Sequence, residues 1–345
     1  MKNGYFRCKK CRLKKCVEVG MRGDGLRLAK VSSRTKIPST MDTFLGRSNL
    51  IIFCAPNPEL AHSKKFINVR CLIKQAEIVL TAGLETPILA ENSLEKMAFG
   101  LNRSRGSENI GPLQRLKFIT KVGRDEVMMF WQSDMLKVTK WLTHFDEFQQ
   151  LPFQIRIQII KGIWRVWSRL DRLISTMIGR RNNTCGDKSM MMSLKDTSIV
   201  FDLKYTKVDI SWQSNYNVEQ LKLFGYSYLD EKSEQLIQEL MSLELTDVEL
   251  AYMMCQLCFY YVGKRFQGVI LEVSERLLEI LSNHLHEYYT REKVCQKYSV
   301  RIASMMRINN QIQNGITKRR AKVELMKIFD VFFVEFSDPE MFVDA

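Results

Sequence analysis

Residues 153–178 have the sequence F-Q-I-R-I-Q-I-I-K-G-I-W-R-V-W-S-R-L-D-R-L-I-S-T-M-I, and this stretch decides the fold. Drawn as a helix, it carries apolar side chains on nearly every side, so it must be surrounded by protein. The basic residues spaced along it interrupt the apolar run too often for a bilayer span. Pro152 stands directly in front, where proline can open a helix. The stretch therefore predicts a buried central helix with other helices on both sides.

Helical patterns also precede this stretch. Residues 125–151 form the clearest one, because apolar side chains recur there at steps of three or four and predict a single stripe. Residues 65–82 form a second amphipathic pattern, which Gly83 ends, and residues 100–112 are expected to be a loop. The stripe comprises Val127, Trp131, Met135, Val138, Trp141, Phe145 and Phe148.

The chain after residue 200 begins with a short β pattern and is then helical again. Apolar and polar residues alternate over 201–210, which predicts a small hairpin or two short strands. The capping box at 246–249 starts a helix, and residues 269–289 form another. Residues 297–336 are expected to be one long helix, or two in line with a break near Gly315 or the basic run at 318–322.

Composition and charge limit the function classes. The chain has 345 residues and a net charge of +14. Residues 1–36 hold twelve Lys or Arg and two acids, a net of +10, which leaves +4 for the rest. A basic block beside a near-neutral body fits a polyanion such as nucleic acid, and it fits a solvated tail or a nuclear-import signal equally well. No apolar run predicts a membrane span or a secretory signal, and an odd number of cysteines, nine, suits a reducing compartment.

Cys8 and Cys11 are the candidate metal ligands. Two thiolates in a C-x₂-C spacing can share one zinc ion, but a structural zinc site needs four ligands. The other candidates, Cys16, Cys54 and His62, have no convincing spacing. Free thiols on a basic helix are the alternative interpretation.

The residues around these cysteines resemble a known family. Residues 6–21, F-R-C-K-K-C-R-L-K-K-C-V-E-V-G-M, resemble the end of the second zinc module of a nuclear hormone receptor DNA-binding domain. The resemblance makes Cys8 and Cys11 the last two ligands of a zinc ion, and Cys16 a helix residue. It also implies that the basic residues of this run contact DNA, namely Lys9, Lys10, Arg12, Lys14 and Lys15.

A second motif of the same family lies at the start of the central stretch. The family's F-x-x-L-x-x-x-D-Q-x-x-L-L-x-x-x-W signature is matched by Phe148, Leu151, Ile159, Ile160 and Trp164. The sequence departs from it where Ile155 and Arg156 replace the usual Asp and Gln. The texture of residues 130–170 looks most like the divergent nematode expansion of the family.

The resemblance implies an architecture and a function. The expected fold is all-α: the three-layer helical sandwich of a nuclear receptor ligand-binding domain, with a small β-hairpin and a zinc-module helix remnant at the N-terminus. The expected domains are the DNA-binding remnant at 1–22, a hinge at 23–60 and the ligand-binding domain at 61–345. The expected protein is a nuclear transcription regulator and not an enzyme. Its partners would be DNA, a small apolar and fatty-acid-like ligand, coregulator helices and a second receptor chain.

The resemblance also assigns candidate sites. Walls of a ligand pocket are expected from Trp131, Met135, Val138, Ile174, Met177, Met254 and Met306, and plain core packing is the alternative for each. The coregulator groove of the family uses a lysine late in its third helix and a glutamate in a C-terminal helix. Its candidates here are Lys140, Thr143, Ile159, Glu335 and Glu340.

The chain lacks part of the family's pattern. The first zinc module and the first two ligands of the second are not in it, which predicts either a truncated gene model or an isoform that cannot recognise a DNA sequence. Two functions therefore remain open. One is a ligand-regulated receptor; the other is an interaction module with a side-chain-filled pocket that sequesters receptor partners.

Overall fold

The structure is a computed structural model, and it divides into two compact units. Residues 1–61 with 223–225 form one unit, and residues 62–222 with 226–345 form the other. The fold below is that of the second unit, and the candidates Cys8, Cys11, Lys9, Lys10 and Arg12 lie outside the described residues. The residues that the structure describes are 14, 15, 18, 19, 64–84, 89–105, 115–194, 197–202, 205–223, 232–292, 298–328 and 331–344.

The central helix is α8, Phe153–Arg181, and it begins directly after Pro152 as predicted. Buried residues occur along its whole length from Ile157 to Arg180. It packs against α4, α6, α10, α11 and α13 and against strand β4, so its all-round apolar surface is covered by protein. The prediction of a buried central helix is confirmed.

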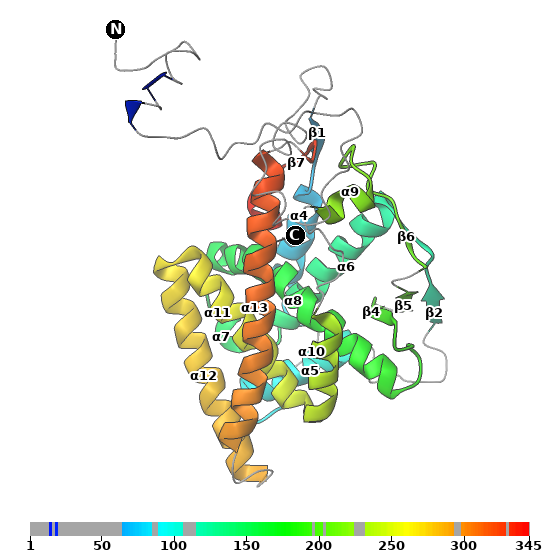
Figure 1. Cartoon of the computed structure of the whole chain (residues 1–345). Helices are drawn as coiled ribbons and strands as arrows, with labels where there is room; N and C mark the ends of the chain where they lie inside the picture. Colours follow the sequence, from blue (N-terminus) through cyan, green and yellow to red (C-terminus); the bar gives the residue numbers. More distant parts are fainter. Residues whose placement is uncertain are drawn as a thin grey trace. The chain divides into compact units, whose positions relative to one another are not determined.

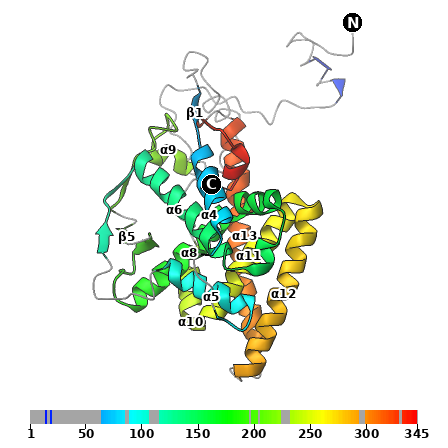
Figure 2. The ribbon, with the colours of Figure 1, turned by 180° about the vertical axis from the view of Figure 1, so that it is seen from behind.

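The helices form three layers around α8 (Figures 1 and 2). The middle layer is α8 and α11, with α12 alongside α11; α4, α5 and α6 cover one side, and α10 and α13 cover the other. The predicted three-layer all-α sandwich is confirmed. The bounds are α4 Arg70–Ala82, α5 Ser93–Ser104, α6 Arg124–Leu142, α10 Ser233–Leu243, α11 Asp247–Phe266, α12 Gly268–Glu292 and α13 Tyr298–Ile328.

The ends of these helices have local causes. The Thr246 hydroxyl accepts from the Glu249 amide, and the Glu249 carboxylate accepts from the Thr246 amide, so the predicted capping box starts α11. Gly83, with a φ of 67°, ends α4 as expected. The chain through Gly315 and the basic run at 318–322 is one continuous helix, α13.

The small hairpin is present, but it lies earlier in the chain than predicted. β4, Ser189–Ser193, pairs antiparallel with β5, Thr197–Asp202. Tyr205, expected in the strand, lies in a turn. The first strand was missed because its centre is the methionine run 190–192, which lacks the alternation of a half-buried strand. Two short parallel pairs lie nearby in sequence: β2 Arg115–Phe118 with β5, and β3 Lys121–Val122 with β6 Lys207–Val208.

The two ends of the folded unit meet in a parallel pair that the sequence did not predict. β1, Lys65–Ile67, pairs with β7, Val334–Phe336, and the two lie together in Figure 1. The helix expected at 65–82 therefore starts only at Arg70, and the helix expected at 297–336 ends by Ile328. Both predictions were wrong at these ends, because a pairing across the whole chain leaves no periodic signal.

Two further expectations need correction. The helix predicted over 125–151 is broken into α6 and the short α7, Asp146–Gln149, by the extended backbone of the fully buried Phe145. Gly100 is not in a loop but inside α5, where a Cβ would lie 2.6 Å from the His144 ring. The glycine is thus a close-packing residue. Residues 106–112 of the predicted loop lie outside the described residues.

Gly162 lets α8 and α11 approach closely, and its replacement should destabilise the fold. A Cβ there would lie 2.6 Å from Val262 Cγ2 and 2.7 Å from Phe266 Cε2. We expect Gly162→Ala to lower the free energy of unfolding by about 1–3 kcal/mol through overpacking, measured by urea denaturation. The control is Gly186→Ala, whose Cβ would meet only Ser189 Oγ at 3.8 Å. Equal stability of the two variants would contradict the close-approach argument.

Candidate functional site

The seven predicted pocket residues all lie in the main hydrophobic core or pack against it. Six are buried, and the partly buried Met306 packs against the same hydrophobic core. They come from four helices: Trp131, Met135 and Val138 from α6, Ile174 and Met177 from α8, Met254 from α11 and Met306 from α13. All seven are therefore core residues, and their role in ligand binding stays a prediction.

Trp131 is the centre of an aromatic cluster. Its ring centroid lies 6.4 Å from Trp164 on α8 and 6.3 Å from Trp212 in the turn after β6. It lies 5.6 Å from Phe336 on β7 and 4.7 Å from Phe342. The cluster therefore joins α6, α8 and the end of the chain in one apolar contact.

The C-terminal segment, residues 337–344, is docked on this cluster. It contains η3, the 3₁₀ turn Pro339–Phe342, in which Met341 and Phe342 are buried. The Trp164 indole N–H donates to the Met341 carbonyl at 3.1 Å, and Lys161 forms an ion pair with Asp338. A segment with buried apolar side chains and a buried hydrogen bond is an integral part of the packing.

Asp344 closes the segment in an arginine-lined recess, and its side chain is 2% exposed. Arg320 Nη2 lies 2.6 Å from one carboxylate oxygen, and Arg265 Nη1 lies 3.1 Å from the other. Arg169 Nη2 donates to the Asp344 carbonyl at 3.0 Å. Burial and the nearby carboxylate raise the pKa of Tyr261, which also accepts from Arg320. Charge pairing thus holds the end of the described chain against α8, α11 and α13.

The coregulator candidates lie in different settings. Lys140 is exposed at the end of α6, whereas Thr143 is 4% exposed and its hydroxyl donates to the Lys140 carbonyl at 2.7 Å. Ile159 is fully buried in α8. Glu335 is exposed on β7 and pairs with Lys64, and it is not on a helix as one interpretation required.

Glu340 is exposed in η3, the turn that Pro339 opens. This position fits the alternative in which the last residues form the C-terminal helix of the groove. A role for Glu340, Lys140 or the other candidates in binding a coregulator stays a prediction.

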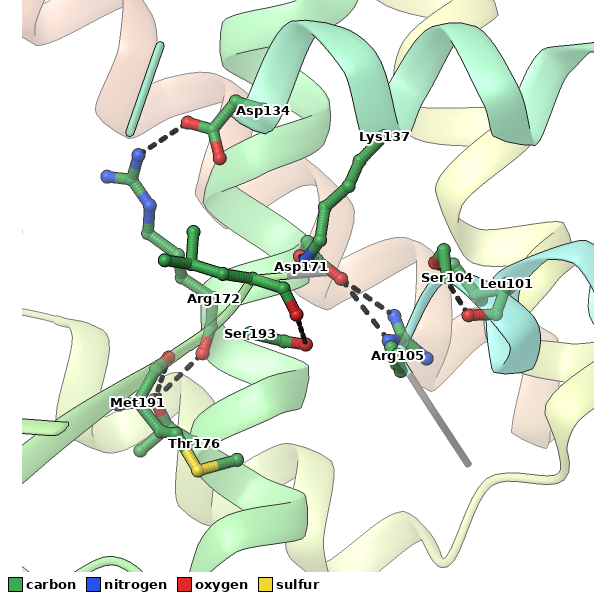
Figure 3. A network of polar contacts seen from close by, with 11 residues as sticks. Leu101, Ser104, Arg105, Asp134, Lys137, Asp171, Arg172, Thr176, Met191 and Ser193 are labelled. Atoms are coloured by element: carbon green, nitrogen blue, oxygen red, sulfur yellow. Dashed lines mark hydrogen bonds and ion pairs between the residues drawn. The ribbon is translucent and has the colours of Figure 1, made fainter. Parts of the chain in front are cut away.

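A buried ionic network joins the C-terminal cap of α5 to α6 and α8 (Figure 3). Asp171 on α8 accepts from Arg105 at 3.2 Å and from Lys137 on α6 at 3.3 Å. Burial opposes ionisation of Asp171, but the two cations outweigh it and hold the pKa of its carboxyl below the usual value.

A second group of charges lies beside the first, one turn earlier on α6. Asp134 on α6 pairs with Arg172 at 2.7 Å and with Arg165 at 4.0 Å. Burial and the nearby Arg172 lower the pKa of Arg165 to about 9, with Asp134 opposing them. Arg165 therefore stays charged at neutral pH, and two cations share one acid.

His144 should make stability depend on pH. Its side chain is 6% exposed, Nδ1 contacts the Lys140 carbonyl at 2.9 Å, and Nε2 is buried without a hydrogen-bond partner. Burial lowers the pKa of His144 below 6.5, although the backbone carbonyls of Lys140 and Trp141 favour the protonated ring. The unfolded chain then binds the proton first, so stability falls as the pH drops below about 6.5. Urea denaturation at pH 8 and pH 5 measures this loss, at most about 1.4 kcal/mol per pH unit. If His144→Gln showed the same pH dependence of unfolding free energy as the parent chain, His144 would not be its source.

The anchors of the C-terminal segment were missed from the sequence. Asp344 is separated from Arg265 by 79 residues and from Arg320 by 24, so no local pattern connects them. The only available signal was the acidic end of the chain, D-P-E-M-F-V-D, opposite a body rich in arginine.

Other surface features are modest. A hollow of about 610 Å³ lies on the outer face of α4, lined by Lys74, Glu77, Ile78, Thr81 and Ala82. Within the described ranges, no group of three or more His, Cys, Asp or Glu side chains is placed to hold a metal ion. No helix in the described part of the chain has an apolar stretch long enough to cross a bilayer.

Comparison with known proteins decides the family. The model of the family described as the ligand-binding domain of nuclear hormone receptor matches residues 113–329. The chain is 46% identical to nuclear hormone receptor family member nhr-55 of Caenorhabditis elegans, over all of this chain and 83% of that protein. The chain belongs to the nuclear hormone receptor family. Family member nhr-98 of the same nematode is 41% identical over all of this chain and 79% of its own length. Family member nhr-130 is 40% identical over 99% of this chain and 81% of its own length.

Family membership settles the class of protein. A nuclear hormone receptor is a transcription regulator and not an enzyme, and the family generally acts in the nucleus with ligands, coregulators and dimer partners. In this receptor chain, α6, α8, α11 and α13 supply the predicted pocket residues and also the surface on which the C-terminal segment docks.

Proposed function

We propose that this receptor chain regulates transcription by presenting a coregulator surface made of α6, α8 and the docked C-terminal segment. The carrying observation is the anchoring of Asp344 by Arg265 and Arg320, together with the burial of Met341 and Phe342. Lys140 and Glu340 are the charged residues proposed to grip a coregulator helix. The test is a transcription reporter with the charge-reversal variants Lys140→Glu and Glu340→Lys. Activity equal to the parent chain in both would overturn the proposal.

We propose a small apolar, fatty-acid-like ligand for the same domain. Four of the candidate wall residues are methionines, whose flexible and polarisable side chains adapt to varied apolar ligands. Arg165 and Arg172 both pair with Asp134, so two cations meet one acid among the described residues, which suits an acidic head group. Native mass spectrometry of the purified full chain should reveal a co-purifying lipid. A clean mass of the protein alone would overturn this part.

The second candidate function is a ligand-independent interaction module that sequesters receptor partners. The observation favouring it is the contact of Trp131 with four other aromatic rings, which fill space between α6, α8 and the chain end. Native mass spectrometry that shows the protein without a bound lipid, together with a melting temperature that added fatty acids leave unchanged, would support this function. A ligand-dependent rise in melting temperature would remove it.

For the N-terminal residues we propose phosphate contact with DNA and a share in a zinc site. Lys14 and Lys15 are exposed, and Lys15 pairs weakly with Glu18 at 3.4 Å. Cys8 and Cys11 supply two of the four thiolates that zinc prefers, so these residues alone do not fit a complete site. Salt-dependent binding to duplexes of different sequence tests the DNA proposal: equal affinity for all sequences is expected, and a strong preference would overturn it.

We further propose that α13 forms the face of a homo- or heterodimer. Light scattering of the full chain, alone and mixed with a second receptor chain, tests this. A monomer under both conditions would overturn it.

A further inference from the structure

Strand β7, which pairs with β1, leads directly into the C-terminal segment. The Lys65 amide donates to the Phe333 carbonyl at 2.7 Å, and the Ser337 amide donates to the Ile67 carbonyl at 3.0 Å. The Ser337 hydroxyl also accepts from the Val69 amide at 2.9 Å. The same hydroxyl donates to Asn68 Oδ1 at 3.5 Å, so three hydrogen bonds fix the first residue of the C-terminal segment to the chain that leads into α4.

Side chains reinforce the pair. Lys64 lies 2.6 Å from Glu335, and the Lys65 ammonium lies 5.0 Å from the centre of the Phe333 ring. Ile67 is 8% exposed and belongs to the main hydrophobic core, so β1 is itself held to the body. β1 therefore offers β7 a fixed support.

The residues just before β7 are held by the turn after β6. The Phe333 amide donates to the Gln213 carbonyl at 3.1 Å, and the Ser214 hydroxyl donates to the Val331 carbonyl at 2.7 Å. β7 thus lies between two supports, of which β1 is the one bonded directly to Ser337.

β7 contacts the docked turn η3 directly. Phe336, the last residue of β7, stacks on Phe342 of η3 with centroids 4.0 Å apart and planes at 15°. Both rings also contact Trp131. A shift of β7 would therefore move the ring that covers Phe342 and loosen the seat of the segment ending in Asp344.

We propose that β1 is a positioning element for the C-terminal segment: its pairing with β7 sets how often residues 337–344 leave the arginine-lined recess. This inference rests on the proposed function in so far as the segment belongs to the coregulator surface. β1 touches neither the recess nor the coregulator candidates Lys140 and Glu340 in any contact described above. It acts through β7 and the Phe336–Phe342 stack.

The ladder geometry supplies a matched pair of variants. In a parallel pair the inward-facing amides belong to alternate residues, so Lys65 and Ile67 bond to β7 and the Phe66 amide points away from it. Lys65→Pro deletes a donor to the Phe333 carbonyl, whereas Phe66→Pro deletes an outward-facing amide. Both side chains are exposed, and Phe66 is 67% exposed, so neither change opens the core.

The experiment is hydrogen–deuterium exchange of the full chain, read in peptides covering 331–344. One backbone hydrogen bond contributes about 1 kcal/mol. We therefore expect Lys65→Pro to speed exchange of the Met341 amide, which donates to the Asp338 carbonyl, by about fivefold. Phe66→Pro should leave that exchange unchanged, and exchange in α8 and α11 should be unchanged in both variants. Equal exchange of the segment in the two proline variants would overturn the proposal.

Ser337→Ala is an independent variant, because it deletes the hydroxyl that accepts from Val69 and donates to Asn68, and it leaves the ladder intact. It should also speed exchange of residues 337–344, and no effect would count against the residues between β1 and α4 as a support of the segment. The reporter assay separates the two proposals. Faster exchange with unchanged reporter activity would leave the positioning role in place and remove the coregulator role of the segment. Unchanged exchange with lost activity of Lys140→Glu would do the reverse.

Discussion

Replacement of Asp171 by asparagine should cost about 3–5 kcal/mol of unfolding free energy, because it removes the buried acid that both Lys137 and Arg105 pair with. The side chains of Asp171, Arg105 and Lys137 are 2%, 6% and 9% exposed, so water screens none of them. Asparagine keeps the volume of aspartate but supplies no negative charge. The loss is therefore electrostatic rather than a cavity effect, and urea denaturation of Asp171→Asn measures it.

A surface pair provides the matched control. Lys96 and Asp146 are 2.5 Å apart, but the Asp146 side chain is 47% exposed. The same change there, Asp146→Asn, should cost no more than about 1 kcal/mol, because solvent screens the pair. Equal losses at the two sites would contradict the role assigned to burial.

A double variant distinguishes an orphaned charge from general damage to the fold. Lys137→Met removes the buried cation that pairs with Asp171, while keeping a long apolar side chain. The combined variant should be more stable than the sum of the two single losses predicts. Strict additivity would show that Lys137 and Asp171 do not act as a pair.

The sequence predicted the central part of this fold well because its signals are local. Residues 153–178 are apolar all round, and Pro152 marks their start, so α8 followed from periodicity and one capping position. The capping box at 246–249 located α11 in the same way. Elements whose sequence signal lies in neighbouring residues can be recognised without tertiary information.

The elements that were missed depend on distant partners. β1 exists because β7 supplies hydrogen bonds from the other end of the chain. The break between α6 and α7 exists because Phe145 turns into the core, where its ring lies 5.9 Å from Phe259 on α11. In each case tertiary contacts overrode a local helical pattern.

The candidate site was predictable only in part, for the same reason. Buried apolar residues on the stripe of α6 were identified correctly as interior residues. The pairing of Asp344 with Arg265 and Arg320 could not be found, because charged residues at the end of a chain are ordinarily solvated. Asp344 is instead buried, and its carboxylate neutralises two arginines of the folded unit.

Truncation of Trp131 to alanine should cost about 3–5 kcal/mol, the range for a large buried aromatic residue. The side chain is 7% exposed, and its ring contacts rings from α8, β7, η3 and the turn after β6. Thermal or urea denaturation measures the loss. The control is Phe118→Ala on β2, where the side chain is 70% exposed and its removal should change stability by less than about 0.5 kcal/mol.

The same variant tests whether the C-terminal segment is part of the core. Phe342 lies 4.7 Å from Trp131, so a double-mutant cycle with Phe342→Ala should give a coupling of about 0.5–1.5 kcal/mol. A coupling near zero would mean that the segment rests on the body without sharing its stability. A coupling in the expected range means that releasing the segment weakens the packing of α6 on α8. Residues that determine docking at the chain end would then also determine the stability of the ligand-binding domain.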